Sequence, residues 1–217
     1  MKMLCFDTSL DKTYISLGFK GYFEQFEIKT DDKNYHSAYL LPKIKEILQN
    51  AKISPQDLDV IVTNCGPGSF TGIRAALSVA KVMALELNLP VVRLNSCEIL
   101  KCAAVDCGIE NPCVVLDARR GMYYFYNGEK IELVLKNNIG NLIKSKNVVC
   151  DKNVYKDLSC NSEARFINYE DENYPLARVM YNLGLGKIKS SQDVANDFSH
   201  TKLKANYIQT PPVFTKD

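Results

Sequence analysis

The sequence predicts an α/β fold that consists of two successive lobes. Three short apolar segments near the start have the spacing of strands, and helix-like and strand-like segments then alternate up to about residue 110. The second half opens with a similar pattern, in which an apolar segment ends in an aspartate and two further strand-like segments follow. Because the pattern occurs twice, we expect an N-terminal lobe over residues 1–110 and a smaller C-terminal lobe with an extended tail over residues 111–217.

Length, charge and composition restrict the class of protein. The chain has 217 residues and a net charge of +2 at pH 7, so it lacks the strongly basic balance of a dedicated nucleic-acid-binding domain. Asp7 lies too early for a signal peptide, and no segment approaches the ~18 consecutive apolar residues of a membrane span. We therefore expect a cytoplasmic protein. Its eight cysteines form no Cys-x-x-Cys pair and are expected to be mostly buried and reduced.

The first elements are expected to be an antiparallel meander and a helix. Residues 4–6, 14–19 and 22–28 are apolar segments separated by turns, which is typical of three consecutive strands. Residues 36–50 then carry apolar side chains at helical spacing. Pro42 lies inside this pattern, so we expect either a kinked helix or a helix whose main body begins near the proline.

A glycine-rich block, residues 66–74, follows the β-branched segment 60–63 and precedes a helical pattern that reaches residue 87. This order predicts a strand, a tight turn and the start of a helix. Ser69 and Thr71 are both candidate N-caps for that helix, because a hydroxyl oxygen can accept a hydrogen bond from a free N–H group of the first turn.

The same block does not match either common phosphate-binding pattern. No lysine follows Gly72, as the Walker pattern requires, and the glycine spacing differs from that of dinucleotide-binding loops. Pro67 also removes one N–H group from the loop. A helix N-terminus still attracts anions, so a ligand role stays open beside a purely structural turn that sets the packing of the helix.

Helix–strand alternation then completes the first lobe. Residues 90–94 are expected to form a strand, and Ser96 is expected to cap a helix that reaches residue 107, with Glu98 in its first turn. A meander followed by this alternation is the ribonuclease H-like arrangement of actin-type ATPases. In those proteins, the turn after the first strand approaches nucleotide phosphate.

The second half predicts a weaker repeat of this pattern. Asn127-Gly128 is a strong signal for a hairpin between two strands. A helix is expected from residue 176 to residue 185, ended by Gly184 and Gly186. The tail from residue 202 is expected to be extended. The expected strands are residues 113–117, 122–126, 130–135, 146–150 and 164–167.

Individual charged residues leave several interpretations open. Asp7 has the chemistry to hold a magnesium ion or to stabilise the turn that follows it. Arg74 lies one turn into its helix, where a cation opposes the helix dipole, which suggests an external anionic partner. Arg119 and Arg120 are close enough in sequence to Asp117 for a surface ion pair.

Four groups of residues match a known pattern. They are Asp7-Thr8-Ser9, His36-Ser37 with Leu40-Leu41-Pro42-Lys43-Ile44, the block from Gly66 to Arg74, and Asp117-Ala118-Arg119. Together they resemble the TsaB family, which is also called YeaZ-like. The glycine-rich block is the most specific of the four. The resemblance covers the first hundred or so residues well and is thinner over the second half.

The resemblance implies an actin-like ATPase-type fold with two ribonuclease H-like lobes, the second of them reduced. It implies a role in making threonylcarbamoyladenosine next to the anticodon of tRNA. In that family this subunit is not the catalyst. It dimerises with a paralogue, TsaD, which carries metal-binding histidines and transfers the threonylcarbamoyl group, and a small ATPase, TsaE, joins the pair. For this chain the resemblance therefore implies that there is no catalytic residue and no bound metal. It also implies that tRNA is contacted only through the complex and that the chain forms a homodimer when the partner is absent.

Two helices are implied as the partner surface, one that opens at Ser37 and one that opens after Gly72. No cofactor is expected on this chain alone, and ATP or ADP is expected only at the interface with the partner. The expected interface residues are Ser37, Leu41, Ile44, Ile73, Arg74, Leu77 and Lys81, and the expected nucleotide or phosphate contacts are Asp7, Thr8, Ser9, Gly68 and Ser69.

The main alternative is an enzyme. It would be a stand-alone ATPase or phosphotransferase, or a peptidase-like hydrolase, that uses Asp7 and the loop from Gly66 to Gly72. The two histidines, His36 and His200, lie far apart in sequence, and there is no Gly-x-Ser-x-Gly nucleophile motif. Both observations favour the non-catalytic interpretation.

Overall fold

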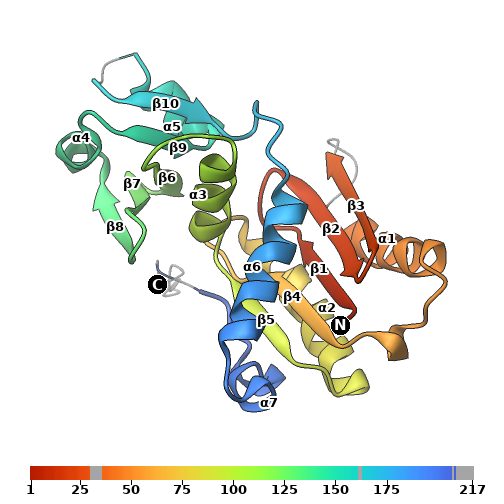
Figure 1. The fold of residues 1–217 in the computed structure, drawn as a ribbon. Helices are drawn as coiled ribbons and strands as arrows, with labels where there is room; N and C mark the ends of the chain where they lie inside the picture. Colours follow the sequence, from red (N-terminus) through yellow and green to blue (C-terminus); the bar gives the residue numbers. More distant parts are fainter. Residues whose placement is uncertain (30–35, 161–162, 207, 209–217) are drawn as a thin grey trace, which may run out of the picture.

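The computed structural model describes residues 1–29, 36–160, 163–206 and 208. Within these ranges the chain forms two five-stranded sheets with helices packed between them and on their outer faces (Figure 1). None of the helices in the described ranges combines the length and the hydropathy that a membrane span requires.

The first sheet has the strand order β3-β2-β1-β4-β5. Its first three strands form the expected antiparallel meander, and the last two strands are parallel to the first. The strands are β1 (Met3–Asp7), β2 (Lys12–Phe19), β3 (Tyr22–Lys29), β4 (Val60–Asn64) and β5 (Val91–Leu94). The helices of this part are α1 (His36–Asn50), η1 (Pro55–Asp57), α2 (Phe70–Leu87) and α3 (Ser96–Asp106).

The second sheet repeats this topology. Its order is β10-β9-β6-β7-β8, so a meander is again followed by two parallel strands on the far side of its first strand. The strands are β6 (Cys113–Arg119), β7 (Met122–Tyr126), β8 (Ile131–Leu135), β9 (Asn147–Cys150) and β10 (Arg165–Asn168). The helices are η2 (Lys136–Asn138), α4 (Ile139–Ile143), α5 (Lys152–Leu158), α6 (Leu176–Ser190), α7 (Val194–Asp197) and η3 (His200–Lys202).

Both halves are therefore ribonuclease H-like, as the sequence predicts, and the second is reduced. Its outer helices α4 and α5 have 5 and 7 residues, whereas α1 and α2, which occupy the same places in the first half, have 15 and 18. The shared strand order is much clearer than the weak repeat in the sequence, because topology depends on which segments are apolar and not on which apolar residue each segment contains.

Two helices lie between the sheets. Figure 1 shows α3 and α6 side by side at the centre of the molecule, and the apolar core that contains them includes side chains of both sheets. Helices α1 and α2 cover the other face of the first sheet in a second core. The α6 helix, although it comes from the second half, packs on the first sheet, where the Ser16 hydroxyl donates to the Ala177 carbonyl oxygen at 3.0 Å.

Close packing of α6 corrects one prediction. The helix does not end at Gly184 or Gly186 but continues to Ser190. A Cβ atom added at Gly184 would lie 2.6 Å from Val62 Cγ2. This glycine therefore allows the helix to approach β4 and does not mark the end of the helix.

One predicted helix cap is wrong, and one of two alternative caps is confirmed. Ser96 is not the cap of α3, because the Asn95 side chain accepts the hydrogen bond from the Glu98 N–H group. Of the two candidate caps of α2, Ser69 takes that role and Thr71 lies inside the helix. Pro42 lies within α1, which is a single helix from His36 onward.

The cysteines are free thiols and most are buried, as expected. The buried ones are Cys5, Cys65, Cys97, Cys113 and Cys150, whereas Cys102 is half-buried and Cys107 and Cys160 are exposed. Most of the tail that was expected to be extended, residues 207 and 209–217, lies outside the described residues.

Candidate functional site

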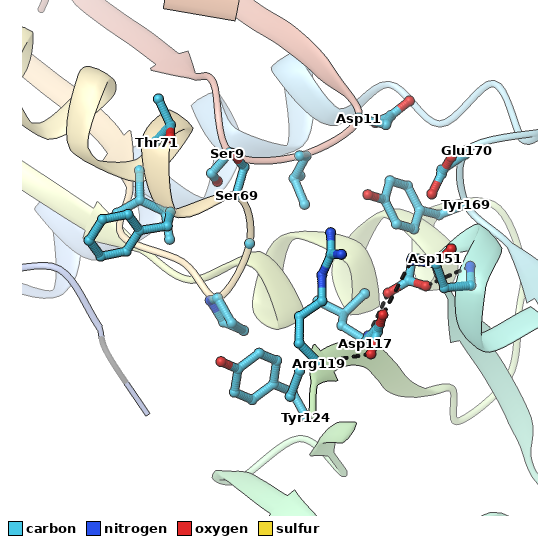
Figure 2. Close-up of a pocket in the computed structure, with 18 of the residues that line it drawn as sticks. Ser9, Asp11, Ser69, Thr71, Asp117, Arg119, Tyr124, Asp151, Tyr169 and Glu170 are labelled. Atoms are coloured by element: carbon cyan, nitrogen blue, oxygen red, sulfur yellow. Dashed lines mark hydrogen bonds between the residues drawn. The ribbon is translucent and has the colours of Figure 1, made fainter. Parts of the chain in front are cut away.

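A cavity of about 670 Å³ lies between the two halves, at the carboxyl ends of the strands of both sheets (Figure 2). Its size suits a small organic ligand. One wall comes from the β1–β2 turn and the glycine-rich block, and the other from the β6–β7 turn and the loops after β9 and β10. The residues that line the two walls include Ser9, Asp11, Pro67, Gly68, Ser69, Asp117, Arg119, Arg120, Asp151, Asn153, Glu170 and Asn206.

Asp7 stabilises a turn and does not line this cavity. Its side chain is 0% exposed. One carboxyl oxygen accepts from the Ser9 N–H group at 2.9 Å and from the Ser9 hydroxyl at 2.6 Å, and the other accepts from the Leu10 N–H group at 3.2 Å. Burial raises the pKa of Asp7, against the opposing effect of these hydrogen bonds. Of the two interpretations open for Asp7, the structure shows the turn.

The glycine-rich block packs directly against the β1–β2 turn. A Cβ atom at Gly72 would lie 1.9 Å from the Thr8 carbonyl oxygen, and one at Gly68 would lie 2.5 Å from that of Ser9. The Ser69 N–H group donates to the Ser9 carbonyl oxygen at 2.8 Å, and the Thr8 hydroxyl donates to the Gly72 carbonyl oxygen at 2.6 Å. These two glycines are therefore required by close backbone contact.

A buried polar network beneath the block includes Asn64, a residue that sequence reasoning missed. The Asn64 amide donates to the hydroxyls of Ser9 and Ser96 at 3.0 and 2.9 Å, and its oxygen accepts from the Gly66 N–H group. The Ser96 hydroxyl in turn donates to the Pro67 carbonyl oxygen. An asparagine at the end of a buried strand was the available sequence signal, because a buried amide requires partners.

The second wall repeats the aspartate turn of the first. Asp117, at the end of β6, accepts from the Arg119 N–H group at 2.9 Å and from the Asn153 amide at 3.2 Å. The carboxyl group of Asp151, a residue the sequence analysis did not single out, accepts from the Asp117 N–H group at 2.6 Å. Arg119 lies beside Asp117 on this wall (Figure 2), and the contact between them is the hydrogen bond from the Arg119 backbone N–H group. None of the ion pairs among the described residues joins Asp117 to Arg119 or Arg120.

Carboxyl groups outnumber cations around the cavity. Burial raises the pKa of Asp11, whose carboxyl group accepts from the Tyr14 hydroxyl at 2.7 Å, and burial also raises that of Asp151. Among the described residues, no group of three or more His, Cys, Asp or Glu side chains is arranged to hold a metal ion. The carboxyl groups on the wall are those of Asp11, Asp117, Asp151 and Glu170, and the cations are Arg119 and Arg120.

Three of the five expected nucleotide contacts are buried, and two are exposed. Asp7, Thr8 and Ser9 are 0%, 0% and 3% exposed, so their side chains offer almost no surface to a ligand. Gly68 and Ser69 are exposed on the cavity wall.

A second site is an apolar groove of about 610 Å³ between α1 and α2. Two of its lining residues, Leu41 and Val82, are 57% and 67% exposed. Leu85 follows Val82 by three residues on α2 and is 66% exposed, although it does not line the groove itself. The groove is lined mainly by apolar side chains, with Lys45, Gln49 and Glu86 among its polar residues. Exposed apolar side chains gathered on one helix pair are typical of a protein-binding surface.

Of the expected interface residues that the structure describes, Leu41 and Ile44 line the groove, whereas Ile73, Arg74, Leu77 and Lys81 do not. Leu41, Arg74 and Lys81 are exposed, and Leu77 is half-buried. Ile44 and Ile73 are only 4% and 3% exposed: Ile44 belongs to the core beneath α1, and Ile73 is among the residues that line the interlobe cavity. Arg74 lies over the Phe70 ring at 5.3 Å. The side chains of His36 and Ser37 lie outside the part of the chain that is described.

Comparison with known proteins agrees with the fold. A family model described as TsaD, tRNA N6-adenosine threonylcarbamoyltransferase, matches residues 30–213. Two solved structures share the fold: YeaZ from Pseudomonas aeruginosa, with a TM-score of 0.72, 20% identity and coverage of 87% of this chain and 92% of that one, and a protein described as similar to it, with a TM-score of 0.76, 18% identity and coverage of 96% and 99%.

Several curated relatives are named tRNA threonylcarbamoyladenosine biosynthesis protein TsaB. The one from Buchnera aphidicola subsp. Schizaphis graminum is 30% identical over 63% of this chain and 69% of its own length. The one from Escherichia coli is 28% identical over 64% of each chain, and one from Buchnera aphidicola subsp. Baizongia pistaciae is 44% identical over 42% of this chain and 40% of its own length. The matched region thus spans between 40% and 69% of these relatives. Together with the fold, these matches show that the chain belongs to the TsaB family, among the proteins that the TsaD model matches.

Proposed function

We propose that this chain is a non-catalytic subunit needed for threonylcarbamoyl transfer to the adenosine next to the anticodon of tRNA. It acts in the cytoplasm as a dimer with a TsaD-like catalytic paralogue, and a TsaE-like ATPase joins the pair. Two findings support the pathway: the name of the relatives and the match to a transferase model over residues 30–213. The observation that carries the proposed mechanism is the exposed apolar groove between α1 and α2.

The groove has the properties of a helix-docking surface. Leu41 on α1 and Val82 on α2 line the groove and are more than half exposed, and Leu85, one turn after Val82, is also more than half exposed. Behind them, Ala76, Ala80 and Ala84 are fully buried, so that α2 itself is firmly held on the sheet. A partner that resembles this chain would present an equivalent helix pair, and the four helices would form a bundle around a pseudo-two-fold axis.

The competing enzyme hypothesis requires Asp7 and the loop from Gly66 to Gly72 to reach a substrate. Asp7 is buried and its carboxyl group already accepts three hydrogen bonds. A general base or a metal ligand must be within hydrogen-bonding reach of the reacting group. The geometry therefore favours the subunit proposal over catalysis at Asp7.

The experiment is a reconstitution with the TsaD-like and TsaE-like proteins of the same organism. Threonylcarbamoyl transfer to tRNA is measured with and without this chain, together with co-elution of this chain and the TsaD-like protein. Val82→Asp and Leu85→Asp are expected to weaken the complex about tenfold or more, because each places a charge in an apolar contact. Val105, on α3, is also an exposed valine, at 51%, and Val105→Asp is the matched control that should bind normally.

The outcomes separate the two hypotheses. Transfer that requires both proteins, and is lost in the α2 variants but not in the control, supports the subunit. Hydrolysis of ATP or of a peptide by this chain alone, without co-elution, would replace the proposal with the enzyme.

A further inference from the structure

The hydroxyl group of Tyr169 is a hydrogen-bonding group that the fold itself does not use. Tyr169 is only 6% exposed and belongs to the core between the sheets. Its hydroxyl makes no hydrogen bond with any of the residues that the structure describes. Figure 2 shows that this hydroxyl points into the interlobe cavity, which Tyr169 helps to line. Because buried polar groups are almost always paired, its direction indicates a partner inside the cavity.

The Tyr169 hydroxyl is a hydrogen-bond donor. Burial raises the pKa of Tyr169, and the carboxyl groups of Asp11 and Glu170 raise it further, so the phenol keeps its proton at neutral pH. The residue is held in place at the end of β10, where its backbone N–H group donates to the Cys150 carbonyl oxygen at 3.0 Å. A fixed O–H donor of this kind suits an oxygen atom of a ligand.

The guanidinium group of Arg119 also points into the cavity. Figure 2 shows it directed from the β6–β7 turn toward the Tyr169 hydroxyl. None of the ion pairs in the described part of the chain includes Arg119. The planar fork of N–H donors in a guanidinium group matches the two oxygens of a carboxylate. Tyr169 and Arg119 together therefore offer donors to one carboxylate group.

Two carboxyl groups that line the cavity each have an oxygen to spare. Asp11 accepts from the Tyr14 hydroxyl with one oxygen at 2.7 Å, and Glu170 accepts from the Lys152 N–H group with one oxygen at 3.0 Å. No other described residue donates a hydrogen bond to the second oxygen of either group. An ammonium group carries three N–H donors and requires acceptors of this kind.

The charges around the cavity favour a ligand that carries both signs. A simple anion would be repelled by the excess of carboxyl groups on the walls, and a simple cation would be repelled by the guanidinium group that points into the cavity. A ligand with one ammonium and one carboxylate group finds a partner for each charge. The volume of about 670 Å³ leaves room for a side chain as well.

We propose that the interlobe cavity binds a free α-amino acid, whose carboxylate is held by Tyr169 and Arg119 and whose ammonium group is held by Asp11 and Glu170. Asp11 comes from the first lobe and the other three residues come from the second, so the bound amino acid links the two lobes. This site goes beyond the proposed function and does not involve the surface on α1 and α2.

The first experiment measures the melting temperature of the full chain with each of the standard L-amino acids in turn. At least one of them is expected to raise it by about 3 °C or more at about tenfold excess over the dissociation constant. Two derivatives of that amino acid are the control ligands: its methyl ester, which lacks the carboxylate, and its N-acetyl form, which lacks the ammonium charge. Neither derivative is expected to shift the melting temperature.

The Tyr169→Phe variant removes only the hydroxyl. Since that hydroxyl makes no hydrogen bond within the described part of the chain, the melting temperature without ligand should stay near that of the wild type. The affinity for the amino acid should fall about tenfold or more. Tyr174→Phe is the matched control, because Tyr174 is also 6% exposed but does not line the cavity. Its affinity should equal that of the wild type.

Two charge variants test the two ends of the ligand. Arg119→Gln should weaken binding at the carboxylate end, and Glu170→Gln should weaken it at the ammonium end. The glutamine at position 170 keeps an oxygen that can accept from the Lys152 N–H group, so the second variant preserves the local hydrogen bond while it removes the charge.

Three results would overturn the proposal. One is a wild-type chain whose melting temperature responds to none of the amino acids. Another is a Tyr169→Phe variant that binds as tightly as the wild type. The third is a methyl ester or an N-acetyl derivative that binds as well as the free amino acid, which would show a site for a single charge. None of these results depends on the TsaD-like partner, so failure here and failure of the proposed function can be distinguished.

Discussion

Thr63 has a buried hydroxyl group that makes no hydrogen bond with any described residue. Its side chain is 0% exposed, and its oxygen has no hydrogen-bond partner among the described residues. Thr8 is equally buried, but its hydroxyl donates to the Gly72 carbonyl oxygen at 2.6 Å. An unsatisfied buried polar group costs free energy, whereas a satisfied one contributes to stability.

We expect Thr63→Val to raise the free energy of unfolding by about 1 kcal/mol, because valine has the same shape and removes the unsatisfied group. The matched variant Thr8→Val should lower it by about 1 kcal/mol, since it removes a buried hydrogen bond to the Gly72 carbonyl oxygen. Urea unfolding of both variants measures the effect. A Thr63→Val variant less stable than the wild type would show that its hydroxyl has an essential partner.

The buried carboxyl group of Asp7 makes stability depend on pH. Burial raises its folded-state pKa above the unfolded value of 3.8, so the native state binds the proton more tightly. The stability due to this group is then complete below the unfolded pKa and is lost as the pH rises through the folded pKa. The free energy of unfolding of the wild type minus that of Asp7→Asn should therefore be larger at pH 4 than at pH 7.

Asp57 provides a control of opposite sign. Hydrogen bonds from Ser54 lower the pKa of its exposed carboxyl group, so its contribution is present above the unfolded pKa and lost as the pH falls through the folded one. The corresponding difference for Asp57→Asn should shrink as the pH falls from 5 to 3. Urea unfolding at each pH measures both differences, and a difference for Asp7 that is independent of pH would contradict the assignment.

At the scale of elements, α6 contains two glycines with different roles. A Cβ atom at Gly184 would lie 2.6 Å from Val62 Cγ2 and 3.2 Å from the Met3 sulfur atom, whereas one at Gly186 would meet nothing within 4 Å. Gly184→Ala should cost about 1–3 kcal/mol through overpacking. Gly186→Ala should stabilise the chain by about 1 kcal/mol, because alanine favours the helix interior. Thermal unfolding of the two variants measures the contrast, and equal effects would exclude a packing role for Gly184.

Most of the strands and the long helices could be predicted from the sequence, because alternation and helical spacing are local signals. The errors occurred at positions where contacts between distant segments of the chain determine the local structure. Gly184 has the local character of a helix end, but its contact with Val62 is made through a strand 122 residues earlier in the chain. The short helices α4 and α5 were missed because 5 and 7 residues are too few to show a helical period.

The site could be predicted only in part for the same reason. Asp7, Ser69 and the glycine-rich block are local patterns and were identified. Asn64 and Asp151 act across strands, so only the sheet topology brings them to the turns they stabilise. Whether the side chains of Ile44 and Ile73 are buried depends on which face of each helix meets the sheet. The helical spacing of apolar residues in the sequence does not specify that face.

At the scale of the whole molecule, the two halves share one core. Helices α3 and α6 lie between the sheets, and Lys101 of α3 donates to the Asn127 carbonyl oxygen in the β7–β8 hairpin at 2.7 Å. The strand repeat divides the chain near residue 110, but the packing does not follow that division.

We therefore expect a fragment of residues 1–110 not to fold on its own, because it lacks α6 and would expose an apolar face of the first sheet. Circular dichroism and urea unfolding of this fragment are compared with those of the full chain. A cooperative unfolding transition in the isolated fragment would show that the first lobe is an independent domain. Addition of residues 111–217 in trans, with recovery of the native spectrum, is the positive control.

The position of α6 also affects how the chain is made. The first sheet is complete once residue 94 has been synthesised, yet the helix that covers one of its faces begins at residue 176. At a ribosomal rate of about 5–20 residues per second, that face waits roughly 4–16 seconds for its cover. During this interval the nascent chain exposes an apolar face of the first sheet. The contact between Ser16 and Ala177, which are separated by 161 residues, can form only after residue 177 of the 217 has been translated.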